Sequence, residues 1–385
     1  MNPTRKVLLG IGGLVLLMIA TVPLSWHLQR GALADALVAD LEATAARSIT
    51  RDPPLEAAKH ENGFACYSAV IETTPADLAP FELKDPGVLS GLMDAGVVAE
   101  PWRTKVTNLE PWAESVRGCG NSERLGYVPS VTPFAPFSDV KAERGTQVLL
   151  SLTKMTRLQA RILGADAKWE QIAELCAGTL EVALDRSHLG LVGAMIASSV
   201  VRQLSPPCGQ ALGHLGPESR DVWTRRFGSL PSRLISNTEL IEIERQAMGL
   251  SAFGWLLSEA QSAKLPPHDS FASDDPLSRF AVARLWTRWD RSMRSLGAAS
   301  KNGSSVRQAA SLERDEVFQE WWIPSELSNR PDYERFFARM DDTALLLGLM
   351  SELASGGEVT LSPKLVRTAS GLEFTDGQGE KVLIP

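Results

Sequence analysis

Residues that commonly bind metals or carry out catalysis are scarce in this sequence. The chain of 385 residues contains five histidines and four cysteines. No cysteine pair has the C-x-x-C spacing, and no cysteine has a histidine at the spacing of zinc ligands. The histidines lie far apart in the sequence, at His27, His60, His188, His214 and His268. The sequence therefore predicts no metal ligands and no cofactor-binding residues.

Linear catalytic motifs are also missing. The chain has no G-x-S-x-G, no H-E-x-x-H, no P-loop and no G-x-G-x-x-G. Ser151 and Lys154 fit the S-x-x-K pattern of penicillin-binding enzymes, but no K-T-G triad follows. One such match is expected by chance in a chain rich in serine. The adjacent carboxylates Asp341 and Asp342 fall in a helical pattern, where neighbouring side chains diverge. We therefore predict no catalytic residues from linear motifs.

The chain has no excess of positive charge. It contains 39 lysines and arginines against 46 aspartates and glutamates, which gives a net charge of -7. Proteins that bind nucleic acids need a basic surface to neutralise phosphates. The charge balance therefore argues against a nucleic-acid partner.

Long apolar runs are absent after the first 24 residues. Residues 7–24 form an uncharged run, VLLGIGGLVLLMIATVPL, which is close to the minimum length of a membrane-spanning helix. Arg5 and Lys6 precede it, and basic flanks stay on the cytoplasmic side. We therefore predict a single-pass protein of the cell inner membrane, with residues 1–27 as the anchor, residues 7–24 in the lipid bilayer and a cytoplasmic N-terminus. The alternative is a cleaved signal peptide and a secreted protein, with Ala32 and Ala34 as an A-x-A cleavage pattern.

The four cysteines all follow the predicted anchor. An even number of cysteines outside the cytoplasm permits two disulfides with three possible connectivities. The sequential pairing, Cys66 with Cys119 and Cys176 with Cys208, closes the shortest loops. The alternative is four unpaired, buried thiols that act as small apolar residues.

The region after the anchor is mostly helical by its apolar periodicity. Residues 28–54 form a juxtamembrane amphipathic helix followed by a proline linker, and residues 55–357 form an extracytoplasmic, irregular helical-hairpin domain. A sub-boundary of this domain falls near residues 121–139, which are rich in proline. The helices expected within the domain include 62–72, 101–117, 139–163, 166–187, 189–204, 217–227, 231–263 and 332–354.

Two of these helices carry specific expectations. Residues 189–204 are rich in glycine, alanine and serine, so they predict a central buried helix that ends before Pro206 and Pro207. They are too short and too polar for a second membrane span. A helix that begins at Pro276 presents Arg284, Arg288 and Arg291 on one face. That face is either an anion-binding surface or an ordinary solvated one.

Residues 358–385 read differently from the rest of the chain. Short runs of alternating polarity at 359–361, 364–368, 371–375 and 381–384 are separated by turn residues. They predict a small β-meander that packs on the helices, because a sheet of this size is not stable alone. The predicted fold class is thus mostly α, with a transmembrane helix before the helical domain and a β-meander after it.

Two classes of function are compatible with these features. The first is a membrane-anchored extracytoplasmic helical protein of scaffold or partner-binding type, which binds a protein. The second is a cell-envelope hydrolase or transferase whose site is assembled from residues far apart in the sequence. The absence of linear motifs favours the first, and convergent polar groups in a pocket would favour the second.

Overall fold

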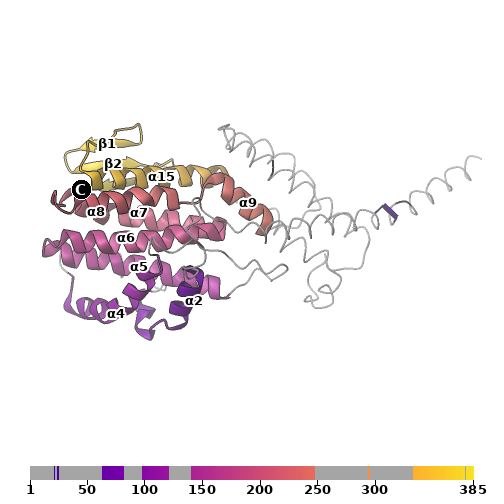
Figure 1. Cartoon of the computed structure of the whole chain (residues 1–385), viewed down its shortest axis with the longest axis horizontal. Coiled ribbons are helices and arrows are strands. Elements are labelled where there is room, and N and C mark those ends of the chain that lie inside the picture. Colours follow the sequence, from indigo (N-terminus) through magenta and orange to yellow (C-terminus); the bar gives the residue numbers. More distant parts are fainter. Residues whose placement is uncertain are drawn as a thin grey trace, which may run out of the picture.

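The computed structural model describes residues 63–81, 98–120, 140–247, 333–377 and 379–385, together with residues 21, 24, 25 and 294. This part of the chain is mostly α-helical, with a small C-terminal antiparallel sheet (Figure 1). None of its helices has the length and apolar character needed to cross a bilayer. The predicted span at residues 7–24 lies outside the described residues apart from Thr21 and Leu24.

A helical hairpin forms the centre of the fold. Helix α6 (Trp169–Arg186) is followed by the short helix η3 (Ser187–Leu189) and by α7 (Leu191–Gly213), and α6 packs along α7. Gly190 joins η3 to α7 with a φ of 97°, which L side chains rarely adopt. The central buried helix predicted at 189–204 therefore exists, as the first part of α7.

The prediction that this helix ends before Pro206 was wrong. Helix α7 continues through Pro206 and Pro207 to Gly213. Each proline removes a backbone hydrogen bond and crowds the preceding turn, at a cost of about 3 kcal/mol. The carbonyls left without a donor are those of Arg202 and Gln203, and both of these residues are partly exposed. The following turns bury Cys208, Ala211 and Leu212, and this burial favours continuation.

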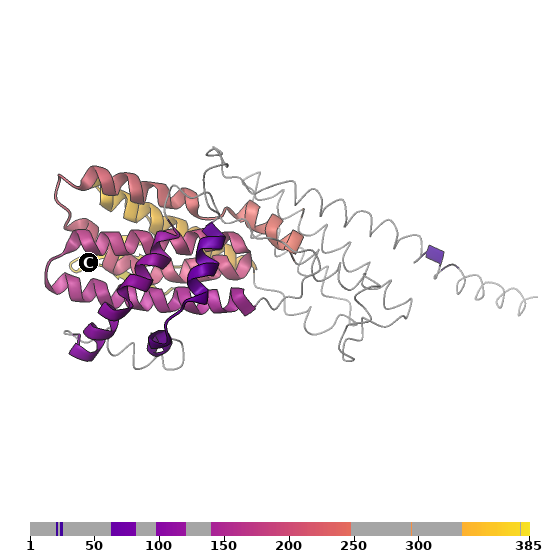
Figure 2. The same cartoon turned by 60° about the horizontal axis from the view of Figure 1, so that its bottom comes forward.

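Other helices surround the hairpin. Helix α5 (Val140–Ala165) contacts both α6 and α7, and α15 (Tyr333–Ser355) packs on α7 and on α8 (Arg220–Arg233). Figure 2 shows α2 (Gly63–Glu72) and α4 (Glu100–Gly118) lying across the bundle, where α2 contacts α5 and α4 contacts α5 and α6. The short helix η2 (Ala76–Phe81) contacts α5 and α4.

The boundary between the next two helices also differs from the prediction. A break before Pro231 was expected, but α8 runs through Pro231 to Arg233, and α9 (Asn237–Ala247) begins after it. Phe227 and Leu230 are fully buried, and the Arg233 side chain is anchored to Asp185, so packing outweighs the cost of the proline. The part of the predicted helix beyond residue 247 lies outside the described residues.

The C-terminal strands form a three-stranded antiparallel sheet in the order β1 (Leu365–Thr368), β2 (Gly371–Thr375) and β3 (Lys381–Ile384). Phe374 pairs with Val382 and Leu372 with Ile384, and all four side chains are buried. Residues 359–361, expected to be a further strand, are not in one. Strand β3 lies on α7, where a Cβ added to Gly209 would come within 2.2 Å of Ile384 Cγ2.

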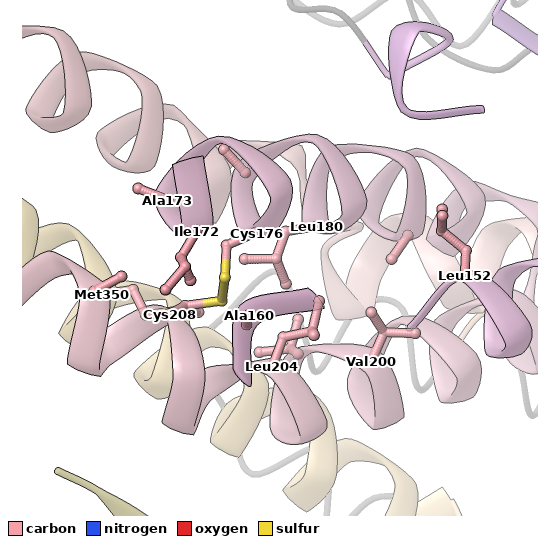
Figure 3. Close-up of a cluster of buried hydrophobic side chains, with 14 of the residues drawn as sticks. Leu152, Ala160, Ile172, Ala173, Cys176, Leu180, Val200, Leu204, Cys208 and Met350 are labelled. Carbon is pink, nitrogen blue, oxygen red and sulfur yellow. A yellow bond between two sulfur atoms is a disulfide. The ribbon is translucent and has the colours of Figure 1, made fainter. Parts of the chain in front are cut away.

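Two disulfides are present, and they join Cys66 to Cys119 and Cys176 to Cys208. The first links α2 to the residue after α4, and the second links α6 to α7. The second bond lies among fully buried apolar side chains, including Leu180 (Figure 3). Of the three connectivities left open by the sequence, the structure has the one with the shortest loops. Structural disulfides of this kind are typical of oxidising compartments.

Candidate functional site

Two adjoining cavities lie along one side of α6, and together we call them the α6 groove. The first, of about 520 Å³, is bounded by α4, α5, α6 and α8. The second, of about 480 Å³, is bounded by α4, α6 and α8. Both are lined by Glu110, Glu174 and Leu175, so the two cavities lie next to each other. The first cavity is the apolar half of the groove and the second is its charged half.

The groove follows from the way α6 meets its neighbours. Glu170, Glu174, Gly178 and Glu181 follow one another at steps of three or four residues, so they share one side of α6. Gly178 lies under α4, where an added Cβ would be 3.1 Å from the Cβ of Arg117. A side chain there would press against α4, and glycine therefore allows the two helices to approach closely.

The charged half is organised by Arg226 of α8. Its guanidinium donates to Glu181 through Nε (2.9 Å) and Nη2 (3.0 Å), and to Glu174 through Nη1 (2.6 Å). Burial opposes the charge of Arg226, but the hydrogen bonds that it donates to these two glutamates raise its pKa above the ordinary value. Arg226 therefore remains a cation and holds both carboxylates in position.

A second arginine, Arg233 of α8, also lies beside the Glu181 carboxylate. Glu181 is almost fully buried, and Arg233 Nη1 lies 3.7 Å from its Oε1. Arg233 also donates to Asp185 (2.8 Å) and to the carbonyl oxygen of Gly120 (2.8 Å). This network fixes α6, α8 and the end of α4 relative to one another, because each of the buried charges has a partner of opposite sign.

Glu110 of α4 connects the two halves. One carboxylate oxygen accepts from Arg117 Nη2 and the other accepts from Gln159 Nε2 on α5. Burial lowers the pKa of Arg117, and the Glu110 carboxylate opposes that effect. Arg117 Nη1 and Gln159 Oε1 have no hydrogen-bond partner among the described residues, although both side chains are more than nine-tenths buried.

The apolar half combines an apolar wall with an acidic edge. Val106, Ile162, Leu163 and Trp223 contribute the wall. Glu170 at the edge is exposed and forms no ion pair with another described residue. The described lining of the two halves includes no serine, cysteine or histidine. The polar groups that converge here are mainly engaged in ion pairs with one another, and the described lining does not join a nucleophile to a base as a hydrolase or transferase requires. The arrangement instead offers apolar contact, hydrogen-bond acceptors and negative charge to a bound group.

The residues singled out from the sequence lie elsewhere. Arg284, Arg288 and Arg291 fall outside the described residues, so their face stays a prediction. His188 is buried and donates from Nε2 to the carbonyl oxygen of Arg233 (3.0 Å), and His214 stacks on the Trp169 ring. The other three histidines are outside the described residues, and the described residues contain no cluster suited to a metal ion.

The S-x-x-K pair is placed on α5. Ser151 is buried, while Lys154 donates from Nζ to the carbonyl oxygen of Phe81 (3.0 Å). Burial lowers the pKa of Lys154. No hydrogen bond joins the two side chains, so this pair lacks the contact of a nucleophile with its base. Both residues lie outside the lining of the α6 groove.

The groove was missed at the sequence level. The acidic stripe of α6 can be read from its spacing, but a charged helical face is usually only a solvated surface. Nothing local connects Glu110 with Gln159, which lie 49 residues apart, or Glu181 with Arg226, which lie 45 apart. No protein-family model, no curated protein and no solved structure matches the chain. The groove itself is therefore the basis for a functional hypothesis.

Proposed function

We propose that this protein is a membrane-anchored, extracytoplasmic helical protein that binds a protein partner, and that the α6 groove forms part of the contact surface. The observation that carries the proposal is a pair of adjoining cavities that together combine an apolar wall with charges held in place by ion pairs. Interfaces use such combinations, because the apolar wall contributes affinity and the fixed charges select the partner.

The location outside the cytoplasm is supported by the disulfides and by the predicted anchor. Cys66–Cys119 and Cys176–Cys208 leave no free cysteine in the chain. Paired cysteines persist in oxidising compartments and are rare in the cytosol. The apolar run at residues 7–24, with basic residues before it, would place the helical domain on the same side of the membrane.

The construction of the groove supports recognition. Its two arginines are engaged by glutamates, so they position carboxylates at the surface of the groove. Preformed charge reduces the cost of ordering side chains during association. A partner would therefore meet a surface that is already arranged for it.

Photocrosslinking in the native membrane tests this proposal. The photoreactive residue p-benzoylphenylalanine replaces Thr107 or Gln171, which are exposed and line the groove. The matched control carries it at Val366, which is exposed on β1. We expect a discrete crosslinked product from both groove positions and none from Val366. Equal crosslinking from all three positions, or none from the groove, would contradict the proposal.

A further inference from the structure

We propose that the apolar half of the α6 groove accepts a lysine or arginine side chain of the partner protein. The aliphatic stem would lie against the apolar wall, and the cationic head would meet Gln159 and the surrounding glutamates. This inference rests on the proposed function, because it specifies the chemistry of the partner at the same site.

The wall suits the stem of a long basic side chain. Val106, Ile162, Leu163 and Trp223 enclose part of a cavity of about 520 Å³, so there is room for an aliphatic chain. Lysine and arginine bury their methylene groups on apolar surface while the charged end reaches polar groups. Trp223 contributes apolar contact to this wall, because the Arg226 guanidinium already lies 5.9 Å from the centre of its ring.

The ionisable side chains that line this half all carry negative charge. The ionisable residues that line it are Glu110, Glu170 and Glu174, and no cationic side chain is among its described lining residues. Glu110 forms an ion pair with Arg117, and Glu174 forms one with Arg226, so both carboxylates are partly neutralised. Glu170 is exposed and forms no ion pair with another described residue. A positively charged group would therefore be attracted, whereas an acidic side chain would be repelled.

Gln159 gives an independent reason to expect a donor. Its side chain is 7% exposed, and its Nε2 is already engaged by Glu110. Its Oε1, which can only accept, has no partner within the described structure. A buried acceptor without a donor is costly, so a donor that reaches this oxygen from the cavity would gain affinity. Ammonium and guanidinium groups donate several hydrogen bonds, while a purely apolar side chain donates none.

Saturation-transfer difference NMR on the full-length protein in lipid nanodiscs tests the preference directly. The probes are the Nα-acetyl amides of lysine, arginine, norleucine and glutamate, which share one backbone and differ in the side-chain head. We expect saturation of the lysine and arginine methylene protons, a weaker effect on norleucine and none on glutamate. Equal effects on norleucine and lysine, or any preference for glutamate, would overturn the inference.

Two substitutions separate charge from hydrogen bonding. Glu170→Gln removes the unpaired carboxylate at the exposed edge, and we expect it to lower the affinity for the lysine probe about threefold. Gln159→Met removes the unpartnered acceptor, together with the Nε2 donor to Glu110, with little change in side-chain volume. We expect the affinity for the lysine probe to fall about fivefold and that for norleucine to rise. Glu218→Gln, an exposed change outside the groove, is the matched control and should have no effect. Unchanged lysine binding in both groove variants would also overturn the inference.

The final test combines both proposals in one experiment. Glu170→Lys reverses the charge at the edge, and in the Thr107 photocrosslinking protein it should reduce the yield of the partner product about tenfold. An unchanged yield of crosslinked product would leave the partner proposal standing, but it would refute the inference that the groove accepts a basic side chain. No product from the parent protein would instead refute partner binding at the groove, whatever the probes show.

Discussion

Glu181 on α6 and Arg226 on α8 form a bidentate ion pair, with Nε donating to Oε1 at 2.9 Å and Nη2 donating to Oε2 at 3.0 Å. The Glu181 side chain is 1% exposed and that of Arg226 is 26% exposed. The buried carboxylate requires a cation, and the parallel hydrogen bonds fix the orientation of both side chains. This pair therefore joins two helices at the charged end of the α6 groove.

Removal of the arginine from this pair should destabilise the fold. We expect Arg226→Met to lower the free energy of unfolding by about 3 kcal/mol, because Glu181 stays buried with only the more distant Arg233 beside it. Urea unfolding followed by circular dichroism measures the change. The double variant Glu181→Leu with Arg226→Met should recover most of the loss. A double variant less stable than the single one would show that the ion pair contributes more free energy to stability than its desolvation costs.

The adjacent aspartates of α15 should differ strongly in their effect. Asp342 is buried and accepts from Lys364 Nζ (2.5 Å) and from the backbone N–H of Gly377 (2.9 Å), so it ties α15 to the C-terminal meander. Asp342→Ala should cost about 3 kcal/mol of unfolding free energy, because it leaves a lysine and an N–H unpaired. Asp341→Ala, on the exposed side of the same helix, should cost less than about 1 kcal/mol. Thermal unfolding of the two variants side by side checks this, and similar losses would contradict it.

A glycine substitution should test the contact between the meander and α7. Gly209→Ala places a methyl group 2.2 Å from Ile384 Cγ2, so we expect a loss of about 1 to 3 kcal/mol as β3 is displaced. Gly213→Ala, near the end of the same helix, meets nothing within 4 Å and should leave stability unchanged or raise it by up to about 1 kcal/mol. Adding Ile384→Ala to Gly209→Ala should restore amide-exchange protection in β2 and β3. Continued loss of protection in the double variant would rule out this steric explanation.

The cysteines provide a test of location as well as of stability. The protein is denatured directly from cells with a maleimide-polyethylene glycol reagent present, with or without a reductant. We expect no mass shift without the reductant and four modified cysteines with it. Four reactive thiols without reduction would refute the location of the domain in an oxidising compartment.

The contribution of each disulfide can be measured separately. Paired alanine substitution of Cys176 with Cys208 should lower the unfolding free energy by about 4 kcal/mol, and that of Cys66 with Cys119 should have a similar effect. Chemical unfolding of the two double variants measures this. A loss well below about 2 kcal/mol would show that the reduced, unfolded chain keeps structure near the cysteines.

Local patterns in the sequence were enough to predict many of the elements. The apolar stripe of Val106, Leu109 and Val116 predicted a helix at 101–117, and α4 is within one residue of that range with these side chains buried. The helix predicted at 332–354 is α15, and the predicted strands at 364–368, 371–375 and 381–384 are β1, β2 and β3. These predictions succeed because helical and strand periodicity depend on near neighbours and on one apolar side.

Where the local rules failed, long-range packing was stronger. Pro206 was expected to end one helix and Pro231 to begin another, yet α7 and α8 continue through them. The residues that follow, including Cys208 and Arg233, are buried or anchored by partners on other elements. The burial and cross-links gained by continuing offset the hydrogen bonds lost at the prolines, and none of that gain is visible from local sequence.

By itself, the sequence determined the helical class, the C-terminal strands and the scarcity of catalytic and metal-binding residues, because each depends on composition or short-range spacing. Only the tertiary structure decided which cysteines pair, how α7 passes two prolines and where the α6 groove lies. The groove depends on contacts such as those of Glu110 with Gln159 and of Glu181 with Arg226. These partners come from different helices, so their meeting is set by how the helices pack.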